Sequence, residues 1–131
     1  MFKQTFLISV ALAASPVQAQ LPLQRDLGLE AARRLADGAL QACRSQGKAI
    51  AVAVLDRGGN VLVLQRHESV GPHNAEASRR KAYTALSTRT DTLALTRTAQ
   101  ASPDARNLAS LPELLLLGGG IALLVQGKPA G

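Results

Sequence analysis

Both histidines of this 131-residue chain lie in one short stretch, RHESVGPHNAEASRRKAY, which spans residues 66–83. His67 and His73 could each bind a metal ion through an imidazole nitrogen. Four cations and a tyrosine accompany them: Arg66, Arg79, Arg80, Lys81 and Tyr83. Arginine pairs with carboxylates through two parallel hydrogen bonds, so the combination predicts a binding site for an anionic ligand.

Each of these residues also has a purely structural interpretation. His73 can pack or face water at the start of a helix, and His67 can be a surface residue at the end of a strand. The cations that follow can form a solvated helix face, because Glu76 and Arg80 are spaced for an ion pair one helical turn apart. Tyr83 can be a core residue. The residues alone leave both interpretations open.

Other catalytic and metal chemistries are poorly represented. His73 and Glu76 lie three residues apart on a predicted helix, but without a further carboxylate they make no metal site. The glycines at 58–59 and 118–120 lack the Lys-Ser/Thr of a phosphate loop, and no serine stands in a nucleophile elbow. Cys43 is the single cysteine, which excludes an intrachain disulfide and favours a small buried residue.

The N-terminus predicts export. Lys3 precedes an apolar run at residues 6–14, and the small residues Val17 and Ala19 complete the pattern of a signal peptide spanning residues 1–19. The run is too short to span a bilayer, so residues 20–131 are expected as one periplasmic or secreted domain without a transmembrane segment. The alternatives are an uncleaved anchor and a cytoplasmic N-terminal helix.

The charge balance favours anionic partners. Without Lys3, fourteen Lys and Arg face nine Asp and Glu, which leaves a formal charge of +5 on the exported chain. Nucleic acid, a membrane surface and a carboxylate-bearing small molecule would all suit this charge. Export makes nucleic acid the least expected of the three, so we predict no nucleic-acid partner.

The first half of the domain predicts a helix followed by a hairpin. Apolar residues recur at helical spacing over residues 27–42, behind a cap at Asp26 and before a stop at Gly47. Two apolar runs, 49–56 and 61–66, then flank a Gly-Gly-Asn turn typical of an antiparallel hairpin. The first run is apolar throughout, which predicts a strand buried in the middle of a sheet.

The second half predicts further helices and a last strand. Asn74 is expected to cap a helix over about residues 75–88, and a helical segment should follow over residues 90–101. A short turn is predicted at residues 102–103. Beyond a triple glycine, residues 121–125 are apolar and predict a strand.

Three motifs in this order resemble the GlcG/HbpS-like haem-binding family. VLDRGGNVLVLQR at residues 54–66 is similar to its V-x-D-x-G-G hairpin, RRKAYTA at residues 79–85 to its K-A-x-T-A helix, and GGGI at residues 118–121 to its G-G-G-x-P strand. Ala122 stands where the family commonly has proline. With the initial helix, the resemblance covers essentially all of residues 20–131.

The resemblance implies a profilin-like α+β fold, in which helices pack on an antiparallel sheet, usually within a homo-oligomer. It also implies a further strand, a G-x-I-G-V-S-G loop and a closing helix, none of which follows in this sequence. We therefore expect a shortened domain that lacks the family's last strand and helix. An apolar strand left unpaired by this loss would invite a partner strand or aggregation.

The resemblance further implies haem or a related tetrapyrrole as the ligand, with a sensing or iron-handling role. On this interpretation His73 is the first candidate for the axial ligand of the iron and His67 the second. The side chains expected to pair with the propionates are Arg66, Arg79, Arg80 and Lys81, and Tyr83 could stack on the ring or ligate iron. Two alternatives stay open: a haem-degrading enzyme, and a cofactor-free accessory or structural subunit.

Overall fold

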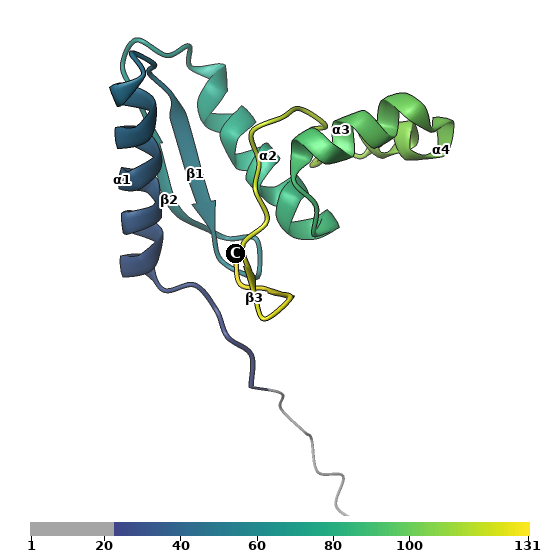
Figure 1. Cartoon of the computed structure of the whole chain (residues 1–131), viewed down its shortest axis with the longest axis horizontal. Helices are drawn as coiled ribbons and strands as arrows, with labels where there is room; N and C mark the ends of the chain where they lie inside the picture. The colour runs from purple at the N-terminus through teal and green to yellow at the C-terminus, as the bar shows by residue number, and fades with distance from the viewer. Residues whose placement is uncertain (1–22) are drawn as a thin grey trace, which may run out of the picture.

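The computed structural model describes residues 23–131, and the predicted signal peptide lies outside them. The elements are α1 (Leu29–Ser45), β1 (Ala51–Leu55), β2 (Val61–Arg66), α2 (His73–Thr88), α3 (Thr92–Ala101), α4 (Pro103–Arg106), a 3₁₀ turn (Asn107–Ser110), β3 (Leu124–Val125) and β4 (Lys128–Pro129). Helices α1 and α2 flank the β1–β2 hairpin, α3 and α4 extend to one side, and the C-terminal segment returns to the tip of β1 (Figure 1). No helix within the described residues is both long and apolar enough to cross a bilayer.

The predicted hairpin forms, and its turn requires glycine at one position. β1 pairs antiparallel with β2, with one irregularity next to the turn. Gly59 is in the left-handed region at φ +82°, and a Cβ there would lie 2.9 Å from the ring of Tyr83. Asp56 accepts hydrogen bonds of 2.9 and 3.1 Å from the Asn60 amide, which is the main reason that the pKa of Asp56 is lowered.

β1 is an edge strand, which corrects the prediction that it lies in the middle of a sheet. Within residues 23–131 it pairs with β2 alone, and β3 pairs with β4 in a separate two-stranded sheet. Its last two residues, Val54 and Leu55, are buried and the first three are half-buried; Val54 joins Val63 of β2 with Ala32 and Ala36 of α1 in the core. Continuous hydrophobicity reflects burial on the faces of a strand, and helices can supply that burial as well as neighbouring strands can.

α1 has nearly the predicted length, but Asp26 is not its cap. The N-cap is Gly28. Asp26 Oδ1 instead accepts a hydrogen bond of 2.8 Å from the backbone N–H of Arg57, which ties the segment before α1 to the hairpin turn. Gly47 follows the end of the helix in the left-handed conformation, at φ +69°, as predicted.

α2 starts earlier than predicted, because Asn74 lies inside its first turn. The helix begins at His73 after an N-cap at Pro72, and the Asn74 amide donates to the carbonyl of Gly71 at 3.2 Å. Arg89 closes α2 in the left-handed conformation, with φ 53° and ψ 32°. A residue type other than glycine is uncommon at such a position.

α3 lies within the predicted segment 90–101, a short helix α4 forms where the sequence predicts a turn, and α3 anchors the returning C-terminal segment. The N-cap of α3 is Asp91, whose Oδ1 accepts a hydrogen bond of 3.0 Å from the backbone N–H of Ala122. Gly120 donates its backbone N–H to Thr92 Oγ1 at 2.8 Å. A Cβ on Gly120 would overlap the carbonyl oxygen of Lys81, so this glycine permits the segment to lie directly against α2.

The predicted strand over residues 121–125 forms only at its end. β3 comprises the last two of these residues and pairs with β4 across a Gln126-Gly127 turn. The backbone of Leu123 continues this pairing through hydrogen bonds with Ala130 and Gly131. Ile121 is 68% exposed, so the segment before β3 has no covering partner strand among the described residues.

Candidate functional site

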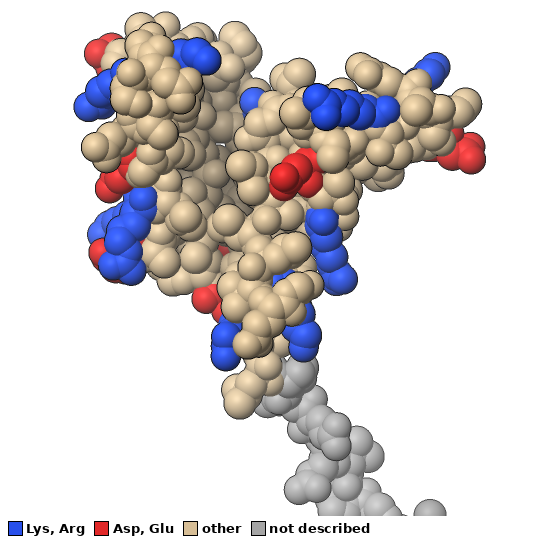
Figure 2. Space-filling view, in the orientation of Figure 1, with Lys and Arg blue, Asp and Glu red and all other residues tan. Residues whose placement is uncertain are grey.

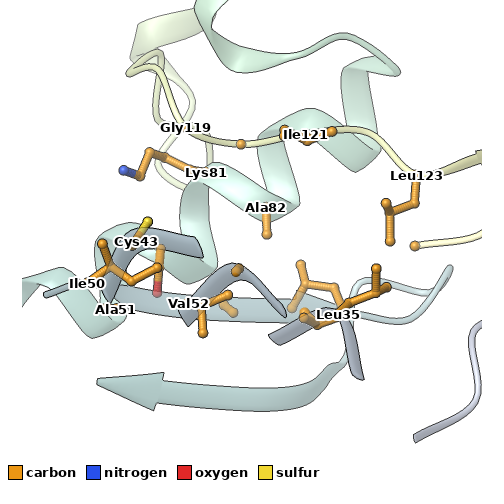
Figure 3. Close-up of a pocket in the computed structure, with 17 residues that line it drawn as sticks. Leu35, Cys43, Ile50, Ala51, Val52, Lys81, Ala82, Gly119, Ile121 and Leu123 are labelled. Atoms are coloured by element: carbon orange, nitrogen blue, oxygen red, sulfur yellow. The ribbon is translucent and has the colours of Figure 1, made fainter. Parts of the chain in front are cut away.

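An apolar pocket of about 370 Å³ lies along the unpaired edge of β1 (Figure 3). One wall is formed by residues 50–55. The other walls come from α1, α2 and the returning segment, through Leu35, Ala39, Cys43, Ser78, Lys81, Ala82, Gly119, Gly120, Ile121, Leu123 and Gly131. A few hundred Å³ with a mostly apolar lining is typical of a small-molecule site.

The polar groups of this pocket lie toward one end. In Figure 3, Lys81, Cys43 and Ile50 are at that end and Leu123 is toward the other, with the Cys43 sulfur pointing to the gap between the walls. Lys81 Nζ lies 3.4 Å from the Gly118 carbonyl. The pocket therefore combines an apolar body with an ammonium group and a thiol at one end.

A smaller pocket of about 190 Å³ adjoins the apolar one at Ile50, which lines both. Its lining includes two cations, Arg44 and Lys48, and the imidazole of His67. His67 Nδ1 lies 2.8 Å from Ser69 Oγ and accepts a hydrogen bond of 3.2 Å from the backbone N–H of Ser69. Because Nδ1 accepts this bond, the ring proton is on Nε2 in this arrangement, and ligation of a metal through Nε2 would require the contact with Ser69 to rearrange.

Arg79 already holds two carboxylates. It donates to Glu76 at 2.7 and 2.9 Å and to Glu113 at 2.9 Å. The hydrogen bonds to Glu76 and then to Glu113 raise the pKa of Arg79, and the same contact with Arg79 lowers the pKa of Glu76. The predicted ion pair between Glu76 and Arg80 does not form, because Arg79 takes this carboxylate and Arg80 turns elsewhere.

Two further predicted cations donate to backbone carbonyls. Arg80 Nη2 donates to the carbonyl of Leu114 at 2.7 Å, and its Nε is buried with no hydrogen-bond partner in the described part of the chain. Arg66 Nη1 donates to the carbonyl of Val70 and so closes the loop between β2 and α2. In this structure Arg66, Arg79 and Arg80 therefore connect segments of the protein itself.

His73 and Tyr83 lie outside the apolar pocket. His73 is exposed in the first turn of α2, with Nε2 3.2 Å from the Asn74 amide nitrogen. Tyr83 packs against Gly59 and lines a different, shallow pocket. The structure thus brings Lys81 to the apolar pocket and His67 to the adjoining one, and it leaves His73 and Tyr83 apart from both. Among residues 23–131, no group of three or more His, Cys, Asp and Glu could hold a metal ion.

Three residues of these pockets were missed from the sequence. Cys43 was expected to be buried, but it is half-buried and lines a pocket wall. Arg44 and Lys48 flank the turn after α1, and the hairpin register brings this turn to His67, whose N–H donates to the carbonyl of Ile50 at 3.1 Å. The predicted hairpin alone could have placed these cations beside His67, because the start of β1 must face the end of β2.

A family described as haem degrading protein HbpS-like matches residues 27–131. This chain belongs to the HbpS-like family. The match confirms the resemblance carried by the hairpin, helix and glycine motifs. It also agrees with the mixed architecture of helices and small antiparallel sheets.

Similar proteins agree with the HbpS-like assignment. A crystal structure of HbpS superposes with a TM-score of 0.78 at 34% identity, over 88% of this chain and 80% of that one. A double glutamate-to-aspartate mutant of Streptomyces reticuli HbpS gives 0.75 at 37% identity, over 89% and 80% of the two chains. An uncharacterised 15.0 kDa protein from the dhaT-dhaS intergenic region of Citrobacter freundii is 30% identical over 105 residues, 79% of this chain and 74% of its own.

A more distant structure shares the fold. The complex of PduOC with haem has a TM-score of 0.70 at 22% identity, over 79% of this chain and 77% of that one. At this identity the likeness concerns the fold of the HbpS-like chain.

Proposed function

We propose that this HbpS-like protein binds haem or a related anionic tetrapyrrole in the apolar pocket. The observation that carries the proposal is the apolar pocket along β1, about 370 Å³, which joins a basic pocket bearing an imidazole at Ile50. Haem offers a flat apolar body, two propionates and an iron that takes an axial protein ligand. The two pockets supply surfaces for each of these parts, which supports the assignment of this ligand class.

The residues have distinct roles in this proposal. The wall formed by β1 excludes water from the apolar body of the ligand. Lys81 at the rim, with Arg44 and Lys48 beside Ile50, provides cations at one end of the pocket, where propionates would be stabilised. Arg66, Arg79 and Arg80 were also candidates for the propionates, but each already makes a short hydrogen bond within the protein, whereas Lys81 Nζ makes only a 3.4 Å contact with the Gly118 carbonyl.

We place His67 before His73 as the axial ligand, which reverses the order expected from the sequence. His67 lines the pocket that adjoins the apolar one at Ile50. His73 lies outside both linings. The Cys43 thiol, which lines the apolar pocket itself, is a further group that could ligate iron.

A haem titration followed by visible absorbance tests this proposal. We expect the folded protein, residues 20–131, to give a saturable shift of the Soret band, which His67→Ala weakens or abolishes. His73→Ala is the matched control, because it removes the other imidazole, and it should leave the shift intact. Loss of the shift in His73→Ala alone would restore His73 as the ligand. A folded protein that gives no shift would contradict tetrapyrrole binding and favour a cofactor-free accessory subunit.

We further propose that the protein is exported and acts as a homo-oligomer in sensing or iron handling. The signal-peptide pattern in residues 1–19 supports export. Exposed apolar side chains support association, with Leu93, Leu117 and Ile121 between 51% and 68% exposed. Mass spectrometry of the protein from a periplasmic extract should find cleavage after residue 19, and light scattering should give a mass above that of one chain.

Haem degradation is the second candidate, favoured by the family description. To distinguish degradation from binding, the haem-loaded protein is supplied with a reductant and oxygen. Loss of the Soret band with release of iron and ring-opened product, faster than for haem alone, would identify an enzyme. A stable spectrum would leave binding as the function.

A further inference from the structure

We propose that a second site, at the other end of β1, binds a multivalent phosphate anion. Four cations line a cleft of about 430 Å³ there: Arg25, Arg57, Arg89 and Lys128. This set is called the cationic cleft below. It lies where the hairpin turn, the turn after α2 and the β3–β4 hairpin meet, and Figure 2 shows Lys and Arg atoms on both sides of that end of the molecule. The site is independent of the proposed tetrapyrrole pocket.

The cations of the cleft come from separate parts of the chain. Arg25 precedes α1, Arg57 is in the β1–β2 turn, Arg89 is in the α2–α3 turn and Lys128 begins β4. Sequence proximity therefore does not account for their meeting. Folding has to bring like charges together, and this arrangement is unfavourable until an anion neutralises it.

These cations are free to bind a ligand. Within residues 23–131 none of the four side chains forms a salt bridge. The carboxylates within two residues of these cations, Asp26, Asp56 and Asp91, accept backbone N–H groups of Arg57, Asn60 and Ala122. None of the residues that line the cleft is a carboxylate, so its surface keeps a positive excess.

Arg89 occupies a backbone position that does not favour arginine. It has φ 53° at the end of α2, where glycine commonly ends a helix, and its side chain is exposed. Packing therefore does not require a long side chain at this site. The arginine is explained if its guanidinium serves the cleft, which it lines.

The chemistry of the cleft points to phosphate. An arginine fork forms two parallel hydrogen bonds with phosphate oxygens, and cations arriving from several directions suit the tetrahedral group better than a planar carboxylate. Arg57 and Arg89 also line a shallower pocket of about 230 Å³ with Tyr83. This extension offers space and an aromatic ring to the organic part of a phosphate ester or of a phospholipid headgroup.

The test compares a cleft variant with a charge-matched control. The double variant Arg57→Gln/Arg89→Gly removes two cations without adding bulk, and it places glycine at the left-handed backbone position. The control Arg33→Gln/Arg97→Gln removes two exposed cations from α1 and α3. By calorimetry with inorganic pyrophosphate, we expect the cleft variant to bind at least about tenfold more weakly than the wild type, and the control less than about twofold. Circular dichroism and the haem titration should be unchanged in both.

A second arm separates a free phosphate ligand from a lipid headgroup. Sedimentation uses phosphatidylcholine vesicles with and without phosphatidylglycerol. If the wild type binds pyrophosphate and the cleft variant does not, the ligand is a free phosphorylated molecule. If the wild type binds only the vesicles that contain phosphatidylglycerol, and the cleft variant does not, the ligand is a lipid headgroup. Equal losses in the cleft variant and the control, or no binding of either probe by the wild type, would overturn the proposal.

Discussion

The two basic regions of this protein use their cations differently. In the histidine region, residues 66–81, the cations lie within one short stretch of the sequence, and Arg66, Arg79 and Arg80 donate to carbonyls or carboxylates of the protein. In the cationic cleft the cations are far apart in the sequence and have no salt-bridge partner within residues 23–131. Density of charge along a sequence is therefore a poor guide to charge that is free to bind a ligand.

The difference follows from what lies opposite each region. Residues 114–118 face α2, and their backbone is outside any helix or sheet. Carbonyl groups in such a segment need donors when they are partly buried. Arg80 and Lys81 supply these donors from α2, at 2.7 Å to Leu114 and 3.4 Å to Gly118. The cleft faces turns exposed to solvent and makes no such demand.

Removing a cation should destabilise the first region and leave the second unaffected. Arg80→Ala loses a charge-assisted hydrogen bond to the partly buried Leu114 carbonyl, so we expect the free energy of unfolding to fall by about 1.5–3 kcal/mol. Arg57→Ala removes only an unpaired side chain and should change it by less than about 0.5 kcal/mol. Urea denaturation measures both. Equal losses in the two variants would remove the distinction between the regions.

A change at Arg89 should separate stability from binding. Arg89→Gly relieves the left-handed conformation at φ 53°, so we expect the free energy of unfolding to rise by about 1 kcal/mol. Arg89→Ala is the matched control, because it removes the same charge but keeps the unfavourable backbone, and it should gain no stability. Thermal unfolding and pyrophosphate binding are measured on the same samples. We expect Arg89→Gly to be more stable than the wild type, and both variants to bind pyrophosphate more weakly. A loss of stability in Arg89→Gly would contradict this account of the position.

Local pattern was sufficient to predict most elements of this fold. The Gly-Gly-Asn turn, the amphipathic α1 and the helical segment that became α3 depend on neighbouring residues, and each lies close to its predicted place. The errors concern contacts between distant segments. Asp26 caps no helix because the hairpin turn offers it the N–H of Arg57, and β1 is an edge strand whose Val54 is buried with α1 and β2.

The candidate sites were harder to predict for the same reason. Lys81 and His67 were expected near a ligand and do line pockets, but Cys43 and Arg44 reach the same area from α1. The cationic cleft depends on four turns and ends meeting in space, which no local spacing records. One residue of the cleft does stand out, because Arg89 occupies a position where glycine is usual, but this can be recognised only once the end of α2 is known.

The smallest effect we predict is a pH dependence in the histidine region. Hydrogen bonding by Arg79 is the largest cause that lowers the pKa of Glu76 from its ordinary value of 4.5, against a smaller opposing effect of desolvation. A lowered pKa in the folded state means that the stabilisation is fully present above pH 4.5 and is lost as the pH falls through the folded-state pKa. Glu76→Gln should therefore be slightly less stable than the wild type at pH 6 and equal to it at strongly acid pH.

Glu30→Gln is the control, since Glu30 meets Arg34 at 3.7 Å with both side chains 73% exposed. Melting temperatures are measured across this pH range. If both variants differ from the wild type by the same small amount, the Glu76–Arg79 pair is no more stabilising than an ordinary surface ion pair.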